Sequence, residues 1–265
     1  MKKNEIIITS ALRTAVGSLG KSLKNSPADS LGSAVISESI KRNKIKNQDI
    51  DEVIMGQVLT GGAGQNPARQ AAMKSGIPKE KPAYIVNQVC GSGLRSVASA
   101  FQSIKAGDSS IIIAGGQENM SLAPHAIHLR DGKKLGNTEI IDTMIKDGLW
   151  DAFHGYHMGI TAENVATKFQ VTREDQDKFA LKSQQKALKA QKENKFKDEI
   201  VDFKIKSKKA EIDFNKDEHP RDGISLDSLI RLKPVFKKDG TVTAGNASGI
   251  NDGAAAVTLM SANEA

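Results

Sequence analysis

Along residues 1–118, short apolar runs are separated by longer segments in which apolar residues recur at helical spacing. The apolar runs predict strands at residues 5–9, 53–58, 82–89 and 109–114. The segments between them predict helices at residues 26–42, 66–75 and 94–105. Ser26 followed by Pro27 is typical of a helix start with proline at the first helical position, and Gly107 is typical of a helix end. This alternation predicts βαβ units around a mainly parallel sheet with helices on both faces.

The pattern changes between residues 119 and 243, where turns and polar segments predominate. This part predicts amphipathic helices at 161–169 and 173–192 and a polar hairpin at 198–213, before an apolar strand at 254–260. We therefore expect an α/β core domain formed by residues 1–118 and 246–265, interrupted by an inserted, loop-rich α/β subdomain at residues 119–245. The chain ends directly after a strand without a closing helix, so we expect it to be a fragment of a longer protein.

Composition places the chain among globular proteins, with 38% hydrophobic and 26% charged residues in a total of 265. Apolar stretches such as residues 111–114 are far shorter than the roughly 18 to 20 residues that a membrane-spanning helix needs. We therefore expect a soluble cytoplasmic protein. The single cysteine excludes an intrachain disulfide and gives no support for an oxidising compartment.

The net charge of +7 comes largely from one region of the chain. Residues 168–209 contain 12 Lys and 1 Arg against 7 Asp or Glu, a local excess of six positive charges. Lysine-rich helices are usually solvated surfaces, although such a stretch can also bind nucleic acid, a membrane surface or ligand phosphates. Because the chain has only two Tyr and one Trp, aromatic platforms for base stacking are scarce. Neither nucleic acid nor a membrane is therefore expected as a partner.

Cys90 lies where a predicted strand ends and a predicted helix begins. The free N–H groups of the first helical turn and the positive end of the helix dipole stabilise a thiolate at such a position. Gly91 and Gly93 leave room for a substrate beside the sulfur. The position suits a nucleophile, and a small buried core cysteine is the alternative that these residues leave open. Without a second cysteine, a redox Cys-x-x-Cys motif and a cysteine zinc site are excluded.

Two histidine pairs have the i,i+3 spacing of metal ligands: His125 with His128, and His154 with His157. No carboxylate or cysteine completes either set, so no metal is expected, and a histidine that acts as a base for Cys90 stays open. Glycine-rich segments are present at residues 61–66, 115–120 and 244–253. None has the spacing of a nucleotide-binding loop, and together they indicate turns and crowded backbone.

Four segments resemble motifs of the thiolase family, in that family's order. They are residues 87–93 (NQVCGSG), 115–121 (GGQENMS), 157–164 (HMGITAEN) and 245–255 (GNASGINDGAA). The likeness extends over the chain from residues 11–14 (ALRT) onward. Within the family, the sequence His157-Met158-Gly159 makes the acetoacetyl-CoA branch the nearest likeness.

The resemblance implies a thiolase-like N-terminal domain, with a layered mixed, mostly parallel sheet, helices on both faces and an inserted subdomain. It also implies that Cys90 attacks a CoA thioester and carries the acyl group, while backbone N–H groups hold the developing oxyanion. A second acetyl-CoA then takes up the acyl group to give acetoacetyl-CoA, and the reverse reaction is thiolytic cleavage. Coenzyme A thioesters are the substrates, no further cofactor or metal is implied, and the expected assembly is a homo-oligomer, a dimer or a tetramer, acting in fatty acid metabolism.

The resemblance further implies that the insert supplies most of the CoA contacts. Around the pantetheine these are Leu149, His157, Met158, Ala244 and Ser248. Near the adenine and its phosphates they are Arg221 and Ser228, and a guanidinium is a suitable phosphate ligand.

The sequence departs from the family pattern in one respect. The family's C-terminal domain brings an asparagine that holds a catalytic water, a histidine in a Gly-His-Pro setting and a second cysteine, and this sequence contains none of these motifs. We therefore expect the chain by itself to be inactive in condensation, to acylate Cys90 slowly at best, and to expose an apolar face. A degradative 3-ketoacyl-CoA thiolase and a CoA-binding or oligomerisation module stay open as alternatives. The motif at His157 argues against a ketoacyl synthase.

Overall fold

The computed structural model describes residues 5–206 and 210–265. Tertiary contacts divide the chain into two compact units. The core unit consists of Met1–Pro124, Asp198–Asp217 and Asn251–Ala265, and the insert unit consists of His125–Lys197 and Glu218–Ile250. Residues 198–217, which the sequence pattern includes in the insertion at 119–245, are grouped with the core unit.

The core unit is built on one seven-stranded sheet with the order β4-β3-β5-β11-β1-β8, and β2 pairs with β11. The strands are β1 (Ile6–Thr14), β2 (Gly17–Ser18), β3 (Glu52–Gly56), β4 (Ala83–Val86), β5 (Ile111–Asn119), β8 (Ile200–Val201) and β11 (Asn251–Ser261). β3 is parallel to β4 and β5, and β1 is parallel to β8. β11 runs antiparallel between β1 and β5, so the sheet is mixed but mostly parallel.

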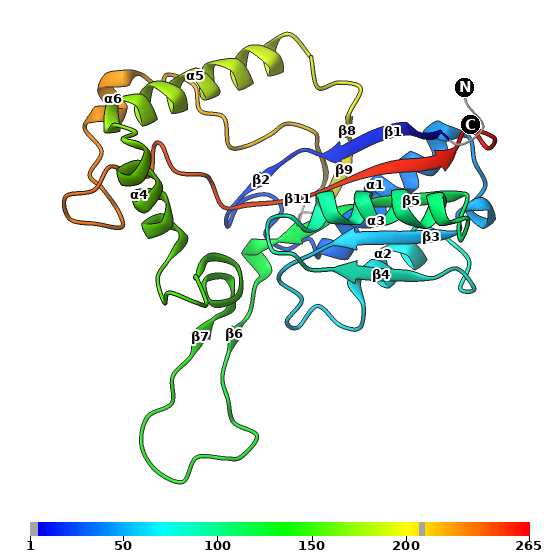
Figure 1. Cartoon of the computed structure of the whole chain (residues 1–265), viewed down its shortest axis with the longest axis horizontal. Coiled ribbons are helices and arrows are strands. Elements are labelled where there is room, and N and C mark those ends of the chain that lie inside the picture. The colour runs from blue at the N-terminus through cyan, green and yellow to red at the C-terminus, as the bar shows by residue number, and fades with distance from the viewer. Residues whose placement is uncertain (1–4, 207–209) are drawn as a thin grey trace. The chain divides into compact units, whose positions relative to one another are not determined.

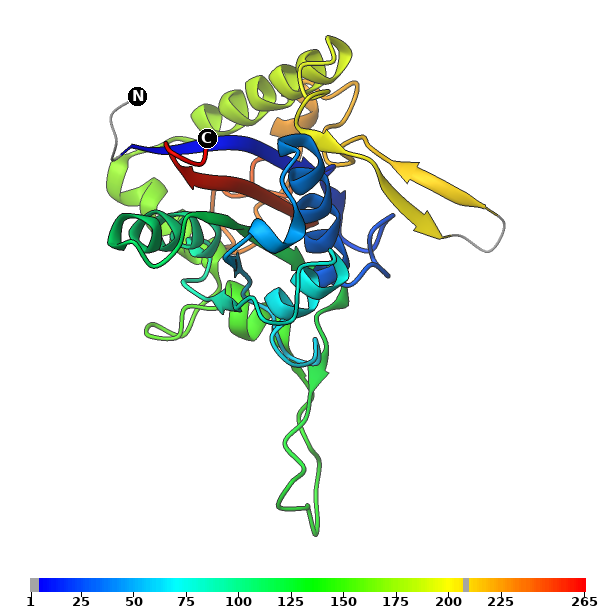
Figure 2. The same cartoon turned by 90° about the vertical axis from the view of Figure 1, so that its right-hand side faces the viewer.

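Helices cover both faces of this sheet, because successive strand residues point to opposite sides. Val53 and Met55 face α1 (Ala28–Asn43) and α2 (Pro67–Lys74) in one apolar cluster. Ile54 and Ile112 face α3 (Ser92–Ala106) in a second cluster on the other side. Figures 1 and 2 show α3 on one face of the sheet and α1 with α2 on the other. The predicted layering is confirmed.

Several predicted boundaries differ from the structure. Pro27 is the N-cap of α1 rather than its first helical residue, whereas Gly107 ends α3 in the left-handed conformation as expected. β5 continues through Gly115 and Gly116, so the prediction of a turn at residues 115–120 is wrong. A Cβ atom on Gly115 would lie 2.0 Å from the carbonyl oxygen of Ala255 in β11, so this glycine permits close strand packing instead of making a turn.

The insert unit contains the predicted amphipathic helices as α4 (Met158–Phe169) and α5 (Arg173–Lys192). It also contains the π-helical turn η3 (Met144–Leu149), the short helix α6 (Leu226–Ile230), and the strand pair β6 (His125–Ala126) and β7 (Ile141–Asp142). Thr172 begins α5 with a reciprocal capping box to Asp175, in which each side chain accepts the other residue's N–H.

The predicted polar hairpin is formed by β9 (Phe203–Lys206) and β10 (Glu211–Phe214). Two short 3-10 turns, η1 (Asn47–Asp49) and η2 (Met120–Leu122), complete the core unit. Arg13 at the end of β1 joins the two ends of the hairpin segment, with its Nε 2.7 Å from Glu199 and its Nη1 2.7 Å from Asp217. These ion pairs attach the hairpin to the sheet of the core unit.

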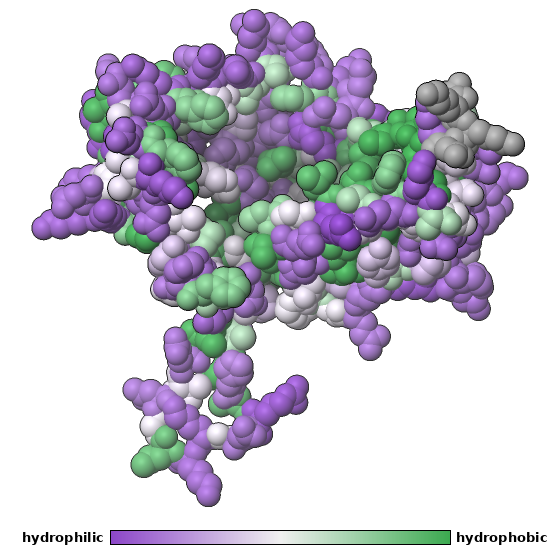
Figure 3. All heavy atoms as spheres, viewed as in Figure 1, coloured by the Kyte–Doolittle hydropathy of each residue, from purple (hydrophilic) through white to green (hydrophobic). Residues whose placement is uncertain are grey.

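The outer side of α3 carries exposed apolar residues. Leu94 is 78% exposed and Phe101 is 48% exposed. Beside α3 lies an apolar pocket of about 440 Å³, lined in part by Leu12, Val97 and Val257. Figure 3 shows hydrophobic side chains gathered over this face of the core unit. None of the described helices has the combination of length and apolar character that crossing a membrane requires.

Candidate active site

Cys90 lies exposed in a pocket of about 370 Å³ in the core unit. The pocket is bounded by the carboxyl ends of β1, β3 and β5, by the first residues of α3 and by the start of β11. In sheets of this type the carboxyl ends of parallel strands meet at one edge, which is the usual place for a ligand site. The exposed thiol opens into a cavity, so the alternative of a buried core cysteine is wrong.

The residue before the cysteine has a strained backbone. Val89 has φ +49°, a left-handed conformation that a β-branched residue rarely adopts and that costs roughly 1–3 kcal/mol. The carboxamide of Asn87 accepts the Val89 N–H at 2.9 Å, and the Gly91 N–H donates to Gln88 O at 3.0 Å. The strand therefore ends in a sharp, bonded turn that carries Cys90 at its exit, directly before the N-cap Gly91 of α3.

Ser92 holds this turn from the helix side. Its Oγ accepts the Gln88 N–H at 2.9 Å and donates to Val89 O at 2.6 Å, and the side chain is buried. The Ser92 N–H also donates to Val89 O. The sequence predicted free first-turn N–H groups beside Cys90, and the structure shows that not all of them are free. The role of Ser92 was missed, although a serine at the start of a helix is a recognised signal for side-chain to backbone bonds.

Glycines let α3 begin directly against the sheet. A Cβ atom on Gly56, the last residue of β3, would lie 2.5 Å from the backbone nitrogen of Gly93. A Cβ atom on Gly116 would lie 3.5 Å from Cα of Gly93. Ser96 fastens the same contact, because its Oγ lies 2.7 Å from the carbonyl oxygens of both Gly93 and Gly115. The crowded backbone predicted from the glycine-rich segments is therefore found where the start of α3, which follows Cys90, packs on β3 and β5.

Two carboxylates also line the Cys90 pocket. Glu118 accepts the N–H groups of Val58 at 2.8 Å and Leu59 at 3.2 Å, and so holds the segment that follows β3. Burial raises the pKa of Glu118; the two N–H groups oppose this shift, and the charge of Asp252 adds to it. Asp252 accepts the N–H of Ser121 at 3.0 Å and its hydroxyl at 2.6 Å. Both acids lie within the resemblance motifs, but only their positions in the fold reveal these contacts.

In the insert unit, three of the residues expected to contact pantetheine lie close together. Leu149 ends η3, and the next residue, Trp150, forms a β-bridge with His157. His157 is the N-cap of α4, with its Nδ1 accepting the Gly159 N–H at 3.0 Å, and Met158 is the first residue of the helix. The imidazole stacks on Phe236 with ring centroids 4.8 Å apart. A Cβ atom on Gly159 would lie 2.2 Å from that ring, so the stack requires the glycine.

The other four predicted contacts occupy three places in the insert unit. Ala244 and Ser248 are exposed on one loop, after residues 241–243. Ser228 is part of α6, where its Oγ accepts the Ser225 N–H at 3.1 Å. Arg221 is exposed, and its backbone N–H donates to the Gln184 side chain of α5 at 3.0 Å.

Two of the four paired histidines lie near a carboxylate. His154 Nδ1 lies 3.1 Å from Asp151, a carboxylate partner that spacing analysis of the histidines did not identify. His125 Nε2 lies 3.9 Å from Oδ2 of Asp142. Within residues 5–206 and 210–265, no group of three or more His, Cys, Asp or Glu side chains is arranged to hold a metal ion.

Comparisons with known proteins agree on one family. The family model described as the N-terminal domain of thiolase matches residues 6–263. Acetyl-CoA acetyltransferase of Rhizobium meliloti is 58% identical over the whole chain, and that of Shinella zoogloeoides is 57% identical. The chain spans 67% of the length of each of these two relatives. The crystal structure of Bacillus anthracis acetyl-CoA acetyltransferase superposes with a TM-score of 0.96 at 41% identity, covering 99% of this chain and 66% of that one.

Proposed function

The chain belongs to the thiolase family, whose N-terminal domain it matches, and from this premise we propose that it carries the acyl-accepting part of an acetyl-CoA C-acetyltransferase. The observation that supports this most directly is the exposed Cys90 thiol, placed by a strained turn in a pocket at the start of α3. The acetyl-CoA acetyltransferase names of the relatives support acetoacetyl-CoA chemistry over the degradative alternative.

In the first proposed step, the Cys90 thiolate attacks the thioester carbonyl of acetyl-CoA. The tetrahedral intermediate expels the CoA thiolate and leaves an acetyl group on the sulfur. In the second step, a base takes an α-proton from a second acetyl-CoA, and the resulting enolate carbon attacks the acetyl-cysteine carbonyl. That attack forms the carbon–carbon bond of acetoacetyl-CoA and releases the Cys90 thiolate. These steps use coenzyme A thioesters and no further cofactor or metal.

The insert unit supports the proposal by residues that are exposed or half-buried. Met158, Arg221, Ala244 and Ser248 are exposed, and Leu149, His157 and Ser228 are half-buried. We propose that Leu149, His157, Met158, Ala244 and Ser248 contact the pantetheine of CoA. We propose that Arg221 and Ser228 contact the adenine and its phosphates. His157 stacks on Phe236 and is engaged with the Gly159 N–H, which suits a wall of a binding site better than a base for Cys90.

We propose that the chain by itself carries acylation but does not sustain condensation, which needs a base for the α-proton. We further propose a homo-oligomer, a dimer or a tetramer, that works in fatty acid metabolism in the cytoplasm. One relative from Rattus norvegicus, 52% identical over 262 residues, is named as a cytosolic acetyl-CoA acetyltransferase, which supports the proposed location.

The test is to mix the 265-residue chain with acetyl-CoA, quench it, and locate the acetyl group by peptide mass spectrometry. We expect an acetyl group on the peptide that contains Cys90, one equivalent of free CoA, and neither product with Cys90→Ala. Acetyl on any other side chain would refute the assignment of the nucleophile. CoA binding without acetyl transfer would instead favour a binding module, and sustained acetoacetyl-CoA formation would contradict the separation of acylation from condensation.

A further inference from the structure

Two buried carboxylates of the insert unit hold the segment at residues 241–248, here called the 241–248 loop. Glu163 of α4 is 4% exposed, and Asp177 of α5 is fully buried. Acidic side chains are rarely buried to this degree unless hydrogen bonds or ion pairs satisfy them. Groups of this loop satisfy Glu163 and one oxygen of Asp177. The same loop carries Ala244 and Ser248.

Glu163 binds the beginning of the loop through three donors. Its carboxylate accepts the N–H and the hydroxyl of Thr241, at 2.8 and 2.9 Å, and the N–H of Val242 at 2.8 Å. A Cβ atom on Gly240 would lie 2.3 Å from the Glu163 carboxylate, so the absence of a side chain there permits the contact. Bonds from N–H groups to a charged carboxylate are stronger than neutral ones. The start of the loop is therefore fixed on α4.

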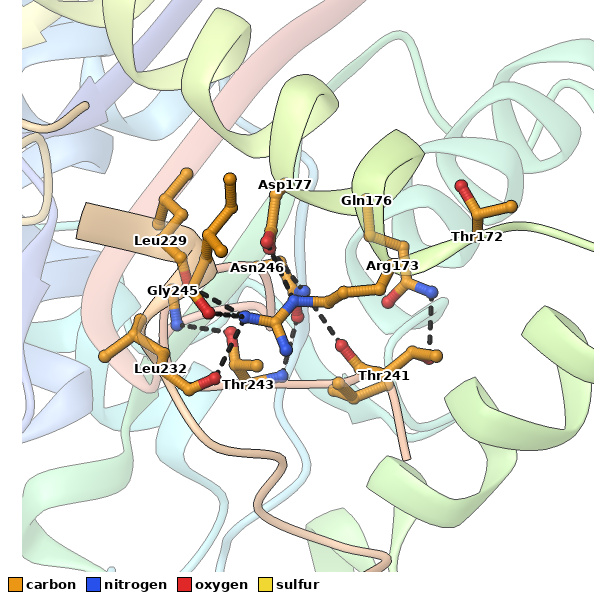
Figure 4. A network of polar contacts seen from close by, with 12 residues as sticks. Thr172, Arg173, Gln176, Asp177, Leu229, Leu232, Thr241, Thr243, Gly245 and Asn246 are labelled. Carbon is orange, nitrogen blue, oxygen red and sulfur yellow. Dashed lines mark hydrogen bonds and ion pairs between the residues drawn. The ribbon is translucent and has the colours of Figure 1, made fainter. Parts of the chain in front are cut away.

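Asp177 binds the middle of the loop through Asn246, as Figure 4 shows. The Asn246 amide donates to Asp177 at 2.9 Å and to Thr241 O at 3.0 Å, while its carbonyl accepts the Thr243 N–H at 2.8 Å. One side chain thus closes the loop on itself and attaches it to α5. A Cβ atom on Gly245 would lie 2.5 Å from the Leu229 side chain, so the loop also packs tightly on α6.

The other oxygen of Asp177 accepts Nε of Arg173 at 2.8 Å. The same guanidinium donates through Nη2 to the carbonyl oxygens of Leu229 at 2.8 Å and Leu232 at 2.9 Å, at the C-terminal end of α6. A guanidinium suits this task because its planar donors point in several directions. The Asp177–Arg173 pair therefore holds two elements at once: the 241–248 loop, and α6 with Ser228.

We infer that Glu163 and the Asp177–Arg173 pair are positioning residues for coenzyme A. Glu163 affects binding of the pantetheine part, whereas the pair affects binding of both the pantetheine and the adenine and phosphates. This inference rests on the proposed function, in which Ala244 and Ser248 contact pantetheine and Ser228 contacts the adenine and phosphates. Glu163 positions only the 241–248 loop. The Asp177–Arg173 pair positions both the 241–248 loop and α6. A loop and helix fixed in the bound conformation lose less conformational freedom when CoA binds, which raises affinity.

The division between the two carboxylates gives a test that a merely structural role would not satisfy. Adenosine 3′,5′-bisphosphate contains the adenine and phosphate side of CoA without pantetheine, so comparing it with CoA separates the two contributions. Affinities are measured by titration calorimetry on the full chain. Glu163→Gln is expected to weaken CoA roughly tenfold and to leave the bisphosphate within about twofold, whereas Asp177→Asn is expected to weaken both roughly tenfold.

A second variant keeps the test valid if Asp177→Asn does not fold. Asn246→Ala removes the amide that joins the loop to α5 but leaves the Asp177–Arg173 pair in place, so it is expected to behave like Glu163→Gln. Glu174→Gln is the matched control on α5, because Glu174 is exposed and pairs along the helix with Lys178, at 2.6 Å, away from the 241–248 loop. It is expected to change neither affinity.

The outcomes separate this inference from the function on which it rests. If the unaltered chain binds neither CoA nor the bisphosphate, the proposed CoA site is wrong. If the unaltered chain binds CoA but folded Glu163→Gln or Asn246→Ala weakens both ligands equally or neither, the positioning role is refuted while the CoA site stands. Loss of CoA affinity alone in those two variants, with loss of both affinities in Asp177→Asn, supports the inference.

Discussion

Replacing Ser92 with alanine tests how the chain holds its nucleophile. Ser92 is buried and makes two side-chain bonds to the turn before Cys90, at 2.9 Å to the Gln88 N–H and at 2.6 Å to Val89 O. Each neutral hydrogen bond contributes about 0.5–1.5 kcal/mol net. Since Gln88 is exposed, water replaces part of the loss, and we expect Ser92→Ala to lower the free energy of unfolding by about 1–2 kcal/mol.

The larger expected effect is on reactivity. The left-handed conformation of Val89 costs about 1–3 kcal/mol, and the Ser92 bonds help to maintain it. Without them the turn relaxes, and Cys90 leaves the position from which it attacks a bound thioester. We expect acetylation of Cys90 by acetyl-CoA to slow about tenfold, as misplacement of a reacting group does. Alkylation by iodoacetamide should change far less, because a small reagent needs only an exposed thiol.

Urea unfolding measures the stability change, and quenched-flow mass spectrometry measures acetylation. Ser103→Ala is the control on the same helix, because the Ser103 hydroxyl donates to Ser109 near the far end of α3, at 3.3 Å, and not to the turn before Cys90. It should change neither quantity appreciably. If Ser92→Ala acetylates at the unaltered rate, the strained turn is not held by Ser92 and this explanation of the site is wrong.

Two further predictions concern the packing of each unit. Burial raises the pKa of Glu163, but the N–H groups of the 241–248 loop outweigh the effect of burial and hold this pKa below its ordinary 4.5. The stability that the Glu163 carboxylate contributes is therefore complete above pH 4.5. It is lost as the pH falls through the lower pKa of the folded state. Urea unfolding over this acid range should show that loss in the unaltered chain and not in Glu163→Gln. Gly56→Ala should cost about 1–3 kcal/mol, because the new Cβ would lie 2.5 Å from Gly93 N, whereas Gly61→Ala, with its nearest neighbour at 3.8 Å, should be neutral in the same assay.

The two units are stabilised by different kinds of contact near their candidate sites. Under Cys90 the backbone is brought close by glycines, so that the start of α3 rests on β3 and β5. In the insert unit the 241–248 loop has little regular structure, and buried carboxylates satisfy its N–H groups instead. Substitutions are thus expected to act by steric clash in the first case and by unsatisfied polar groups in the second.

Periodicity located the elements well because it reflects local geometry. Helical spacing gave α2 and α5 nearly to the residue, and Gly107 ended α3 as a left-handed residue. For α4 it gave the end at Phe169, whereas the start lies at Met158 rather than at the predicted residue 161. The failure at Gly115 and Gly116 has a non-local cause. Glycine pairs usually mark turns, but here β11, from the far end of the chain, lies too close for side chains. The local sequence pattern around Gly115 and Gly116 does not show that β11 packs beside them.

By itself, the amino-acid sequence determined the strand and helix alternation, the position of Cys90 at a helix start and, through its motifs, the family. Only the tertiary structure decided which groups surround those residues. Glu118 accepts a hydrogen bond from Val58, Asp252 from Ser121, and Glu163 from Thr241, and the residues of each pair are 60 or more positions apart in the sequence. Such pairs form where strand order and helix packing bring distant segments together, and a buried carboxylate must then bond whichever donors arrive beside it. Local patterns encode the elements, whereas contacts between elements depend on the whole fold.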